Sequence, residues 1–334
     1  MDILVKSFNR PYYLERCLRS LKLQLRGNYT IKVLDDGTPE KYLQRIGTLF
    51  PDVQVFRSPF YAQKAAAIDA AARNEALYSL FSIPSRFWID AVSGSTDLFY
   101  LFEDDFWLTR PLSLPDVEAV MRHEQLVMVK THWGDNPHFL KGPKRTLTPE
   151  INAYRPKIPA QVDFLFHNRL RSLSILHRLG LFQINTRFIM PLYDLYSVAS
   201  AFFDKHYWLY LWNTAQDGKV NENLQLINAI RYWKTRKPSF AYYPVDVSTT
   251  SYITSATNNY EGIDLDVFRF NHILNEAWLE GRLDAMEGYP ADLPQTTIET
   301  ILNQAADPAA SFPEWLKWVE RFKGQYASFG YLIP

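Results

Sequence analysis

Short apolar runs alternate with helical patterns over the first third of the chain. Four runs read as strands, at 3–5, 31–34, 53–56 and 97–102. Leucine and other apolar residues recur at helical spacing over 14–25 and 42–46, and the alanine-rich segment 62–80 predicts a helix that lies close against a sheet. This alternation predicts an α/β fold, with a mostly parallel central sheet flanked by helices.

The rest of the chain has a less regular pattern and is expected to end in helices. No topology is assigned to 116–200, although 170–181 is amphipathic. Apolar residues recur every three or four positions over 220–233, 270–283 and 312–326, which predicts three helices and a helical C-terminal extension. We therefore divide the chain into a first half (1–115), a second half (116–250) and the extension (251–334), the last boundary resting on the polar run 248–259.

Polar residues gather where the predicted strands end. The first strand is followed by 7–11, the second by Asp35-Asp36-Gly37-Thr38-Pro39, and the fourth by Glu103-Asp104-Asp105. Ligands of open α/β sheets bind outside the carboxyl ends of the strands. We expect these three loops to converge on one crevice.

The composition excludes some classes of protein and of binding partner. The 36 Lys and Arg residues balance 36 Asp and Glu residues, so no net positive field favours nucleic acid. Cys17 is the single cysteine, which excludes an intramolecular disulfide and a cysteine-based zinc cluster. No charged leader and no apolar run of membrane-spanning length is apparent. We expect a cytoplasmic protein, with peripheral contact to a membrane left open.

Four motifs, in order, resemble a known family. They are Lys6-Ser7-Phe8-Asn9-Arg10-Pro11 with the helix that follows, Val33-Leu34-Asp35-Asp36-Gly37-Thr38, Ala72-Arg73-Asn74, and Glu103-Asp104-Asp105. Together they resemble the GT-A fold of glycosyltransferases, particularly family 2, over about the first third of the chain. Further on, 203–223 is similar to the stretch leading to the catalytic carboxylate of that family, but Asn221-Glu222-Asn223 replaces its usual acidic pair.

The resemblance implies that 1–115 is the nucleotide-sugar-binding half of the domain and 116–250 the acceptor-binding and catalytic half. It also implies roles for the residues at the strand ends. Asp105 is the expected ligand of a divalent cation, Mn²⁺ or Mg²⁺, which neutralises the departing diphosphate. Three adjacent carboxylates would repel each other unless a cation joined them, although a solvated acidic turn is the simpler alternative. The nucleotide-sugar-binding residues are expected to be Ser7, Phe8, Asp35, Asp36, Arg73, Glu103 and Asp104, with Lys64 as a weaker candidate. For Asp35 and Asp36 the alternative is an Asx turn, and for Arg73 a solvated helix face.

A general base must also take the proton of the acceptor hydroxyl. Glu222 is the candidate, because it opens a predicted helix whose dipole favours the ionised carboxylate. The same position suits a glutamate that merely stabilises the helix, so Asp217, Asp194 and Asp135 are kept as reserves. His272 is weighed as an extra metal ligand and more readily explained as a core or capping histidine.

These observations predict an enzyme. We expect a metal-dependent, inverting glycosyltransferase that moves a sugar from a nucleotide diphosphate to a hydroxyl of a glycan or glycolipid, such as a polysaccharide precursor. The alternatives are a nucleotidyltransferase acting on sugar phosphates, for which no glycine-rich phosphate loop is apparent, and an inactive nucleotide- or sugar-binding module. The apolar stripe within 312–322 fits docking onto the catalytic domain better than contact with a membrane or a lipid-linked acceptor.

Overall fold

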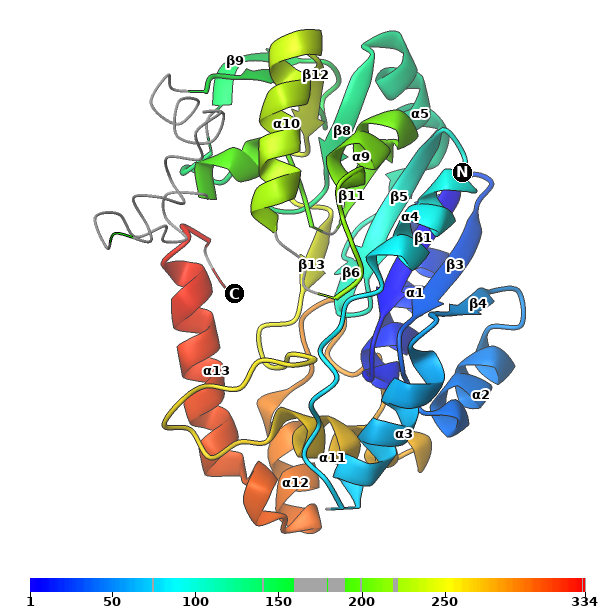
Figure 1. Ribbon diagram of the computed structural model, residues 1–334, viewed down its shortest axis with the longest axis vertical. Coiled ribbons are helices and arrows are strands. Elements are labelled where there is room, and N and C mark those ends of the chain that lie inside the picture. Colours follow the sequence, from blue (N-terminus) through cyan, green and yellow to red (C-terminus); the bar gives the residue numbers. More distant parts are fainter. Residues whose placement is uncertain are drawn as a thin grey trace.

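A nine-stranded sheet runs through the part of the chain that the computed structural model describes, namely residues 1–73, 75–139, 141–158, 179, 190–198, 200–218, 222–331 and 333 (Figure 1). Its strands are β1 (Asp2–Ser7), β3 (Thr30–Asp35), β4 (Gln54–Arg57), β5 (Leu98–Glu103), β8 (Leu126–Lys130), β9 (Lys141–Thr146), β10 (Asn152–Pro156), β11 (Ala201–Asp204) and β12 (Ser239–Tyr242). Two small sheets pair β2 (Leu25–Arg26) with β7 (Leu112–Ser113), and β6 (Phe106–Leu108) with β13 (Ser248–Thr250).

The order of the large sheet is β4-β3-β1-β5-β11-β8-β12-β10-β9. The first four strands are mutually parallel, β8 and β12 are parallel to each other, and β11 is antiparallel to both β5 and β8. The predicted α/β fold with a mostly parallel central sheet is therefore confirmed. β11 was not predicted, because a four-residue strand inserted between two earlier strands leaves no local pattern of its own.

Helices cover both faces of this sheet. They are α1 (Pro11–Gln24), α2 (Glu40–Leu49), α3 (Tyr61–Ala72), α4 (Ser85–Ser93), α5 (Leu114–His123), α9 (Lys205–Trp212), α10 (Glu222–Arg236), α11 (Val267–Leu279), α12 (Gln295–Ala305) and α13 (Phe312–Ala327), with 3₁₀ turns η1 (Met190–Asp194) and η2 (Pro308–Ala310). Successive side chains of a strand point to opposite faces. Accordingly, Ile3 and Val5 of β1 belong to the core under α1, α2, α5 and α11, whereas Leu4 packs with α4, α9 and α10.

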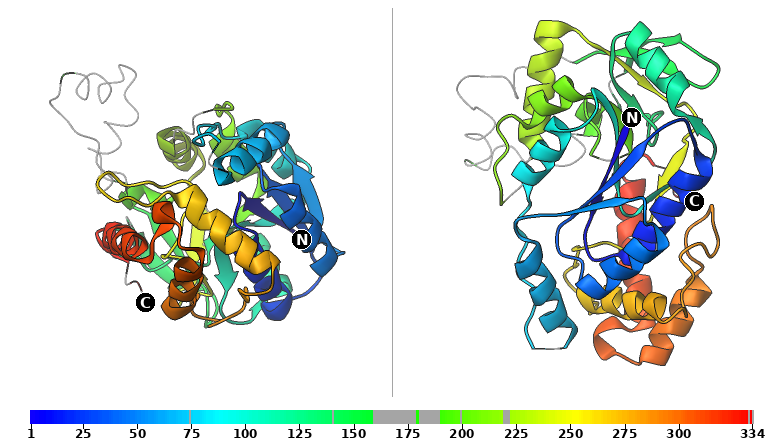
Figure 2. Two further views of the ribbon diagram at one scale, coloured as in Figure 1. Left: turned by 90° about the horizontal axis from the view of Figure 1, so that it is seen from below. Right: turned by 90° about the vertical axis from the view of Figure 1, so that its right-hand side faces the viewer.

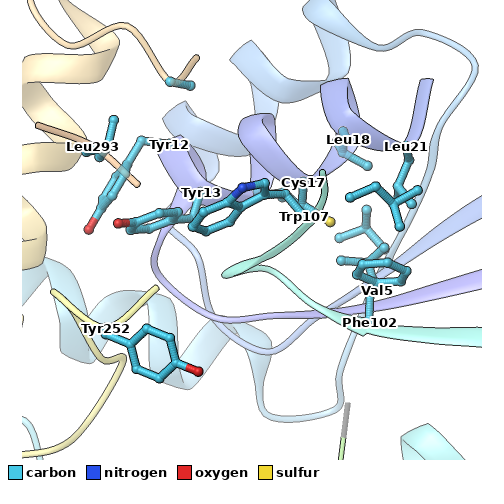
Figure 3. Packing of buried hydrophobic residues seen from close by; sticks show 14 of the residues in the cluster. Val5, Tyr12, Tyr13, Cys17, Leu18, Leu21, Phe102, Trp107, Tyr252 and Leu293 are labelled. Carbon is cyan, nitrogen blue, oxygen red and sulfur yellow. The ribbon is translucent and has the colours of Figure 1, made fainter. Parts of the chain in front are cut away.

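Aromatic side chains fill much of the first core. Tyr12 and Tyr13 of α1 lie beside Trp107 of β6, and the rings of Tyr13 and Trp107 stack with centroids 6.0 Å apart (Figure 3). The indole nitrogen of Trp107 donates to the carbonyl of Pro290. These contacts fasten the C-terminal segment to the first helix.

The C-terminal helices form a layer against the N-terminal half. α11 contacts α1, α2 and α3, and the three helices α11, α12 and α13 follow one another around one end of the molecule (Figures 1 and 2). Their inward residues, among them Trp278 and Trp315, join the same core as β1 and α1. The helical extension predicted from sequence is thus present, and α13 docks onto the rest of the chain. The three-part division at 115 and 250 stays a prediction.

Most predicted elements of the N-terminal third are present, as are the helices at 220–233, 270–283 and 312–326. The helix predicted over 62–80 ends at Ala72. Helices α4, α5, α9 and α12 were not predicted, and the amphipathic stretch 170–181 lies outside the described residues except for residue 179. None of the described helices has the length and apolar character that a membrane span requires.

Candidate active site

The three polar strand ends lie together at one edge of the sheet. In register, Ser7 of β1 is opposite Asp35 of β3, and Lys6 is opposite Glu103 of β5. The backbone N–H of Phe8 donates to Oδ2 of Asp104 at 2.8 Å, which ties the first loop to the third. The predicted convergence of these loops is therefore a feature of the structure.

The Asp35 carboxylate stabilises the turn that follows it. Its carboxylate accepts from the backbone N–H of Gly37 at 3.0 Å and of Thr38 at 2.8 Å, and from the Thr38 hydroxyl at 2.6 Å. Burial raises the pKa of Asp35 to about 6, although these donors oppose the rise. Gly37 has φ of +142°, and a Cβ there would lie 2.6 Å from Cβ of Lys64. The Asx-turn alternative describes Asp35 well.

Asp36, in contrast, faces a cavity. It accepts from the Ser58 hydroxyl and from Nζ of Lys64, both at 2.5 Å, and both its side chain and that of Lys64 are at most 10% exposed. Burial raises the pKa of Asp36, and the hydrogen bonds from Lys64 and Ser58 oppose this. The pair places a fixed carboxylate and a fixed ammonium side by side in one wall.

This first cavity has a volume of about 300 Å³ and combines aromatic rings with cations. Phe8 lies 5.9 Å from Tyr78, whose ring stacks on Phe268 of α11 at 4.2 Å. Lys64, Lys6 and Arg10 also line the cavity, as do Ser7, Asp36, Glu103 and Asp104. Flat apolar surfaces together with cations suit a ligand that carries both an aromatic base and a negative charge.

Two internal cations pair with the three carboxylates of the acidic triplet. The Arg10 guanidinium donates from Nη2 to Oδ1 of Asp104 at 2.5 Å and from Nη1 to Oδ2 of Asp105 at 2.8 Å. Lys6 pairs with Glu103 at 2.5 Å. Burial raises the pKa of Asp104 and of Asp105, and Arg10 opposes this rise in both. Sequence reasoning expected a bound cation to relieve the repulsion and missed Arg10, although it stands within the first loop motif.

One carboxylate oxygen of Asp105 has no hydrogen-bond partner among the described residues. Its Oδ1 is buried and accepts no hydrogen bond from the described residues, whereas Oδ2 is held by Arg10. Within the described ranges, no three His, Cys, Asp or Glu side chains form a ready-made metal cage. Hard cations that bind nucleotides take one or two carboxylates and complete their shell with phosphate oxygens and water. The donor set thus fits a nucleotide-bound Mn²⁺ or Mg²⁺ held through Oδ1.

A second cavity of about 290 Å³ adjoins the triplet on its other side. Glu103 lines both cavities, and Asp105 lines the second. Its remaining wall is largely aromatic and includes Trp133 and Tyr252, each of which contacts Tyr326 of α13, with ring centroids 5.6 and 5.4 Å apart. The second cavity is therefore lined in part by α13 and in part by residues of the central sheet.

His132 is the imidazole of this second cavity, and sequence reasoning did not single it out. Its Nδ1 lies 3.0 Å from the carbonyl oxygen of Ser248 and 3.1 Å from Oδ2 of Asp246. His132 and Asp246 lie in loops that are far apart in sequence, so no spacing in the sequence could have indicated this pair.

Several predicted residues lie elsewhere. Arg73 caps the end of α3 and pairs with Glu75 on the surface, where its side chain is 60% exposed, so the structure does not bring it to either cavity. His272 lies beside Tyr42 and Glu276 and lines neither cavity. Glu222 is the first residue of α10, as predicted, and its side chain lies outside the description.

The reserve carboxylates differ in their surroundings. Asp217 is exposed and accepts from the backbone N–H of Arg86 at 2.8 Å, next to Gly218, which pairs with Ile83 at the wall of the first cavity. Asp194 is buried in η1, and Asp135 lies 3.2 Å from Lys144. Of these, Asp217 lies nearest the described wall of the first cavity.

The comparisons with known proteins agree with the sequence motifs. A model of glycosyl transferase family 2 matches residues 2–75, from β1 through the end of α3. This match confirms the predicted resemblance to family 2 glycosyltransferases over the segment that contains Ser7, Asp36 and Lys64. It also confirms the predicted class of enzyme. A search of curated proteins found no match.

Three solved structures illustrate the similarity. TarS 1–349 of S. aureus in complex with UDP-GlcNAc is 13% identical, with a TM-score of 0.42, over 96% of this chain and 80% of that one. The mannosyltransferase PcManGT of Pyrobaculum calidifontis, in complex with GDP-Man and Mn²⁺, is 13% identical (TM-score 0.36, 99% and 76%). Glucosyl-3-phosphoglycerate synthase of Mycobacterium tuberculosis, in complex with Mn²⁺, UDP-glucose and phosphoglyceric acid, is 12% identical (TM-score 0.35, 84% and 79%).

Proposed function

We propose that the protein transfers a sugar from a nucleotide diphosphate in the first cavity to a hydroxyl of an acceptor in the second. The observation that carries this proposal is the junction at the end of β5, where Glu103 lines both cavities and Asp105 faces the second. A transferase must bring the anomeric carbon of the donor within reach of the acceptor oxygen. Adjoining cavities that meet at carboxylates supply that arrangement.

The first cavity would bind the donor through two kinds of contact. The base packs against the aromatic rings of Phe8 and Tyr78 that line the cavity, while Lys64 and Arg10 face the diphosphate. Asp36 accepts a hydrogen bond from the base or ribose, as its exposed edge in the cavity permits. Asp35 acts behind it, by holding the turn.

A divalent cation, held through Oδ1 of Asp105, would neutralise the charge that develops on the leaving diphosphate. Arg10 supports this role by fixing Asp105 through the other oxygen, Oδ2. Glu103 and Asp104, which are held by Lys6 and Arg10, would orient the ribose or the water molecules of the cation. These residues keep the carboxylates in place before the donor arrives.

The remaining parts of the proposal concern the acceptor side. We propose transfer with inversion to a glycan or glycolipid, as in polysaccharide biosynthesis at the cytoplasmic side of a membrane. Aromatic rings of the second cavity suit the apolar faces of a sugar. Glu222 is the candidate base from sequence, placed at the start of α10 where the helix dipole favours its ionised form.

Donor binding and hydrolysis with UDP- and GDP-sugars test this function. Calorimetry with and without EDTA should show binding that Mn²⁺ strengthens, and Asp105→Asn should lose that metal effect while circular dichroism shows that the variant remains folded. Consumption of a nucleoside triphosphate with a sugar phosphate would instead indicate a nucleotidyltransferase. Tight donor binding with no turnover for any acceptor or water would indicate an inactive binding module.

A further inference from the structure

A histidine–carboxylate pair lies in the wall of the second cavity. His132 follows β8 and Asp246 follows β12, two strands that are neighbours in the sheet. The Asp246 carboxylate also accepts from the backbone N–H of Trp133 at 3.1 Å, which fixes the oxygen that faces the imidazole. The pair is therefore held on one side by the backbone N–H of Trp133, in the loop after β8, and on the other by the carbonyl of Ser248 in β13.

The partners of His132 determine which ring nitrogen carries the proton. Nδ1 faces two groups that can only accept, the Ser248 carbonyl and the Asp246 carboxylate. Nδ1 must therefore donate, and in the neutral ring Nε2 carries the lone pair. The nearest described polar contact of Nε2 is the Tyr252 hydroxyl at 3.4 Å, which is too long for a strong hydrogen bond.

This geometry resembles the arrangement in which a carboxylate orients a histidine that removes a proton. His132 lines the same cavity as Asp105 and Glu103, and its ring lies 5.4 Å from that of Phe106, the residue that follows Asp105. We propose that His132 is the general base for the acceptor and that Asp246 is its positioning residue. This inference rests on the proposed function and names a residue that the family resemblance did not supply.

The step is balanced within the two cavities. The acceptor hydroxyl gives its proton to Nε2 of His132, and its oxygen forms the new bond to the anomeric carbon. The bond from that carbon to the diphosphate breaks, and the electron pair leaves with the nucleoside diphosphate. The positive charge on the imidazolium is then stabilised by Asp246, which stays ionised beside it.

The simpler explanation is that His132 is a buried histidine that only supports the cavity wall. Its low exposure and its edge-on contacts with Phe106 and Tyr331 are compatible with that role. A supporting residue would alter folding and binding together, whereas a base alters turnover alone. The experiment must therefore separate turnover from donor binding.

Hydrolysis of UDP-glucose and GDP-mannose in the presence of Mn²⁺ provides the assay, with water in place of the acceptor. His132→Gln should lower the hydrolysis rate by about a hundredfold, the usual contribution of a general base, with unchanged affinity for the nucleoside diphosphate. Asp246→Asn should cost about tenfold, because the Ser248 carbonyl still holds the same tautomer. Added imidazole should restore part of the rate of His132→Ala.

Each other outcome has a definite meaning. His206→Gln, an exposed histidine of α9 that lines neither cavity, is the control and should hydrolyse like wild type. Normal hydrolysis by His132→Gln, or a loss confined to Glu222→Gln, would overturn the assignment. A rate loss in His132→Ala that imidazole leaves unchanged, together with weaker nucleotide binding, would show a supporting role. If the native protein neither binds nor hydrolyses any nucleotide sugar, the proposed function itself fails and the inference with it.

Discussion

Arg10 pairs with two of the three carboxylates of the acidic site, so its removal tests how much this residue stabilises the site. Its guanidinium bridges Asp104 and Asp105, and the side chains of Arg10 and Asp104 are 8% and 2% exposed. Arg10→Met keeps much of the length and apolar stem but leaves two adjacent carboxylates without their shared cation. The variant therefore isolates the charge rather than the packing of this residue.

The expected loss follows from the burial of the pair. Breaking a buried ion pair by removing one partner costs about 3 to 5 kcal/mol, because the remaining charge is left uncompensated. This is a large part of the free energy of unfolding of an average protein, about 5 to 15 kcal/mol. Arg57→Met is the matched control, since Arg57 pairs with Glu40 on the surface at 2.8 Å and with 44% exposure. Its removal should cost less than about 1 kcal/mol.

The loss should also depend on pH with a defined sign. Burial raises the pKa of Asp104 to about 7 against the opposing effect of Arg10, so removal of Arg10 raises it further. A carboxyl whose pKa is higher in the folded state favours folding at low pH, and this contribution disappears as pH rises through the folded pKa. Arg10→Met should therefore lose more stability at about pH 8 than at about pH 5.5.

Urea denaturation of both variants, monitored by tryptophan fluorescence, measures these changes. Addition of Mn²⁺ should stabilise Arg10→Met more than wild type, because the cation binds the two freed carboxylates in the folded state. A loss below about 1 kcal/mol, equal to that of Arg57→Met, would refute the view that Arg10 holds the site. A loss that grows as pH falls would contradict the direction given for Asp104.

Three further predictions concern the loops and the base. Since burial raises the pKa of Asp35 to about 6, its ionisation should cost the folded state up to about 3 kcal/mol between pH 4 and pH 8, and urea denaturation of Asp35→Asn should show a flatter dependence on pH. Lys64→Met should weaken nucleoside diphosphate binding by about tenfold in calorimetry, whereas exposed Lys22→Met should bind normally. Because we assign the base to His132, Glu222→Gln should leave sugar transfer intact, and a loss of about a hundredfold with unchanged donor affinity would return the role to Glu222.

The strand ends could be predicted because their signals are local. An apolar run followed by Asp-Asp-Gly or Glu-Asp-Asp indicates both the strand and its carboxyl end, and parallel strands bring such ends to one edge. The observed order β3-β1-β5 places the three strand ends side by side. Sequence alone thus located the region that contains Ser7, Asp36 and Glu103.

The partners within that region could not be predicted, because each depends on contacts between distant segments. Arg10, which pairs with Asp104, follows Asn9, and Asn9 adopts a left-handed conformation with φ of 54° and is held by Thr38 and Asn275. Asp35 and Asp36 are adjacent in sequence and both buried, but Asp35 accepts hydrogen bonds within its own turn, whereas Asp36 accepts from Lys64 and faces the cavity. Residue type and spacing are identical for both, so no local pattern separates their roles.

The second cavity depends most on tertiary structure, and this explains why its chemistry was the least accessible from sequence. Its carboxylates come from the end of β5, its imidazole from the loop after β8, and part of its aromatic wall from α13 near the end of the chain. The family match ends at residue 75, before all of these. The matched segment contributes Lys6, Ser7 and Arg10 to the first cavity, whereas the segments that would select the acceptor lie beyond it. We therefore expect donor binding to use residues of the matched segment and acceptor selection to use residues that follow it, since a fold shared by many proteins carries its specificity in the site.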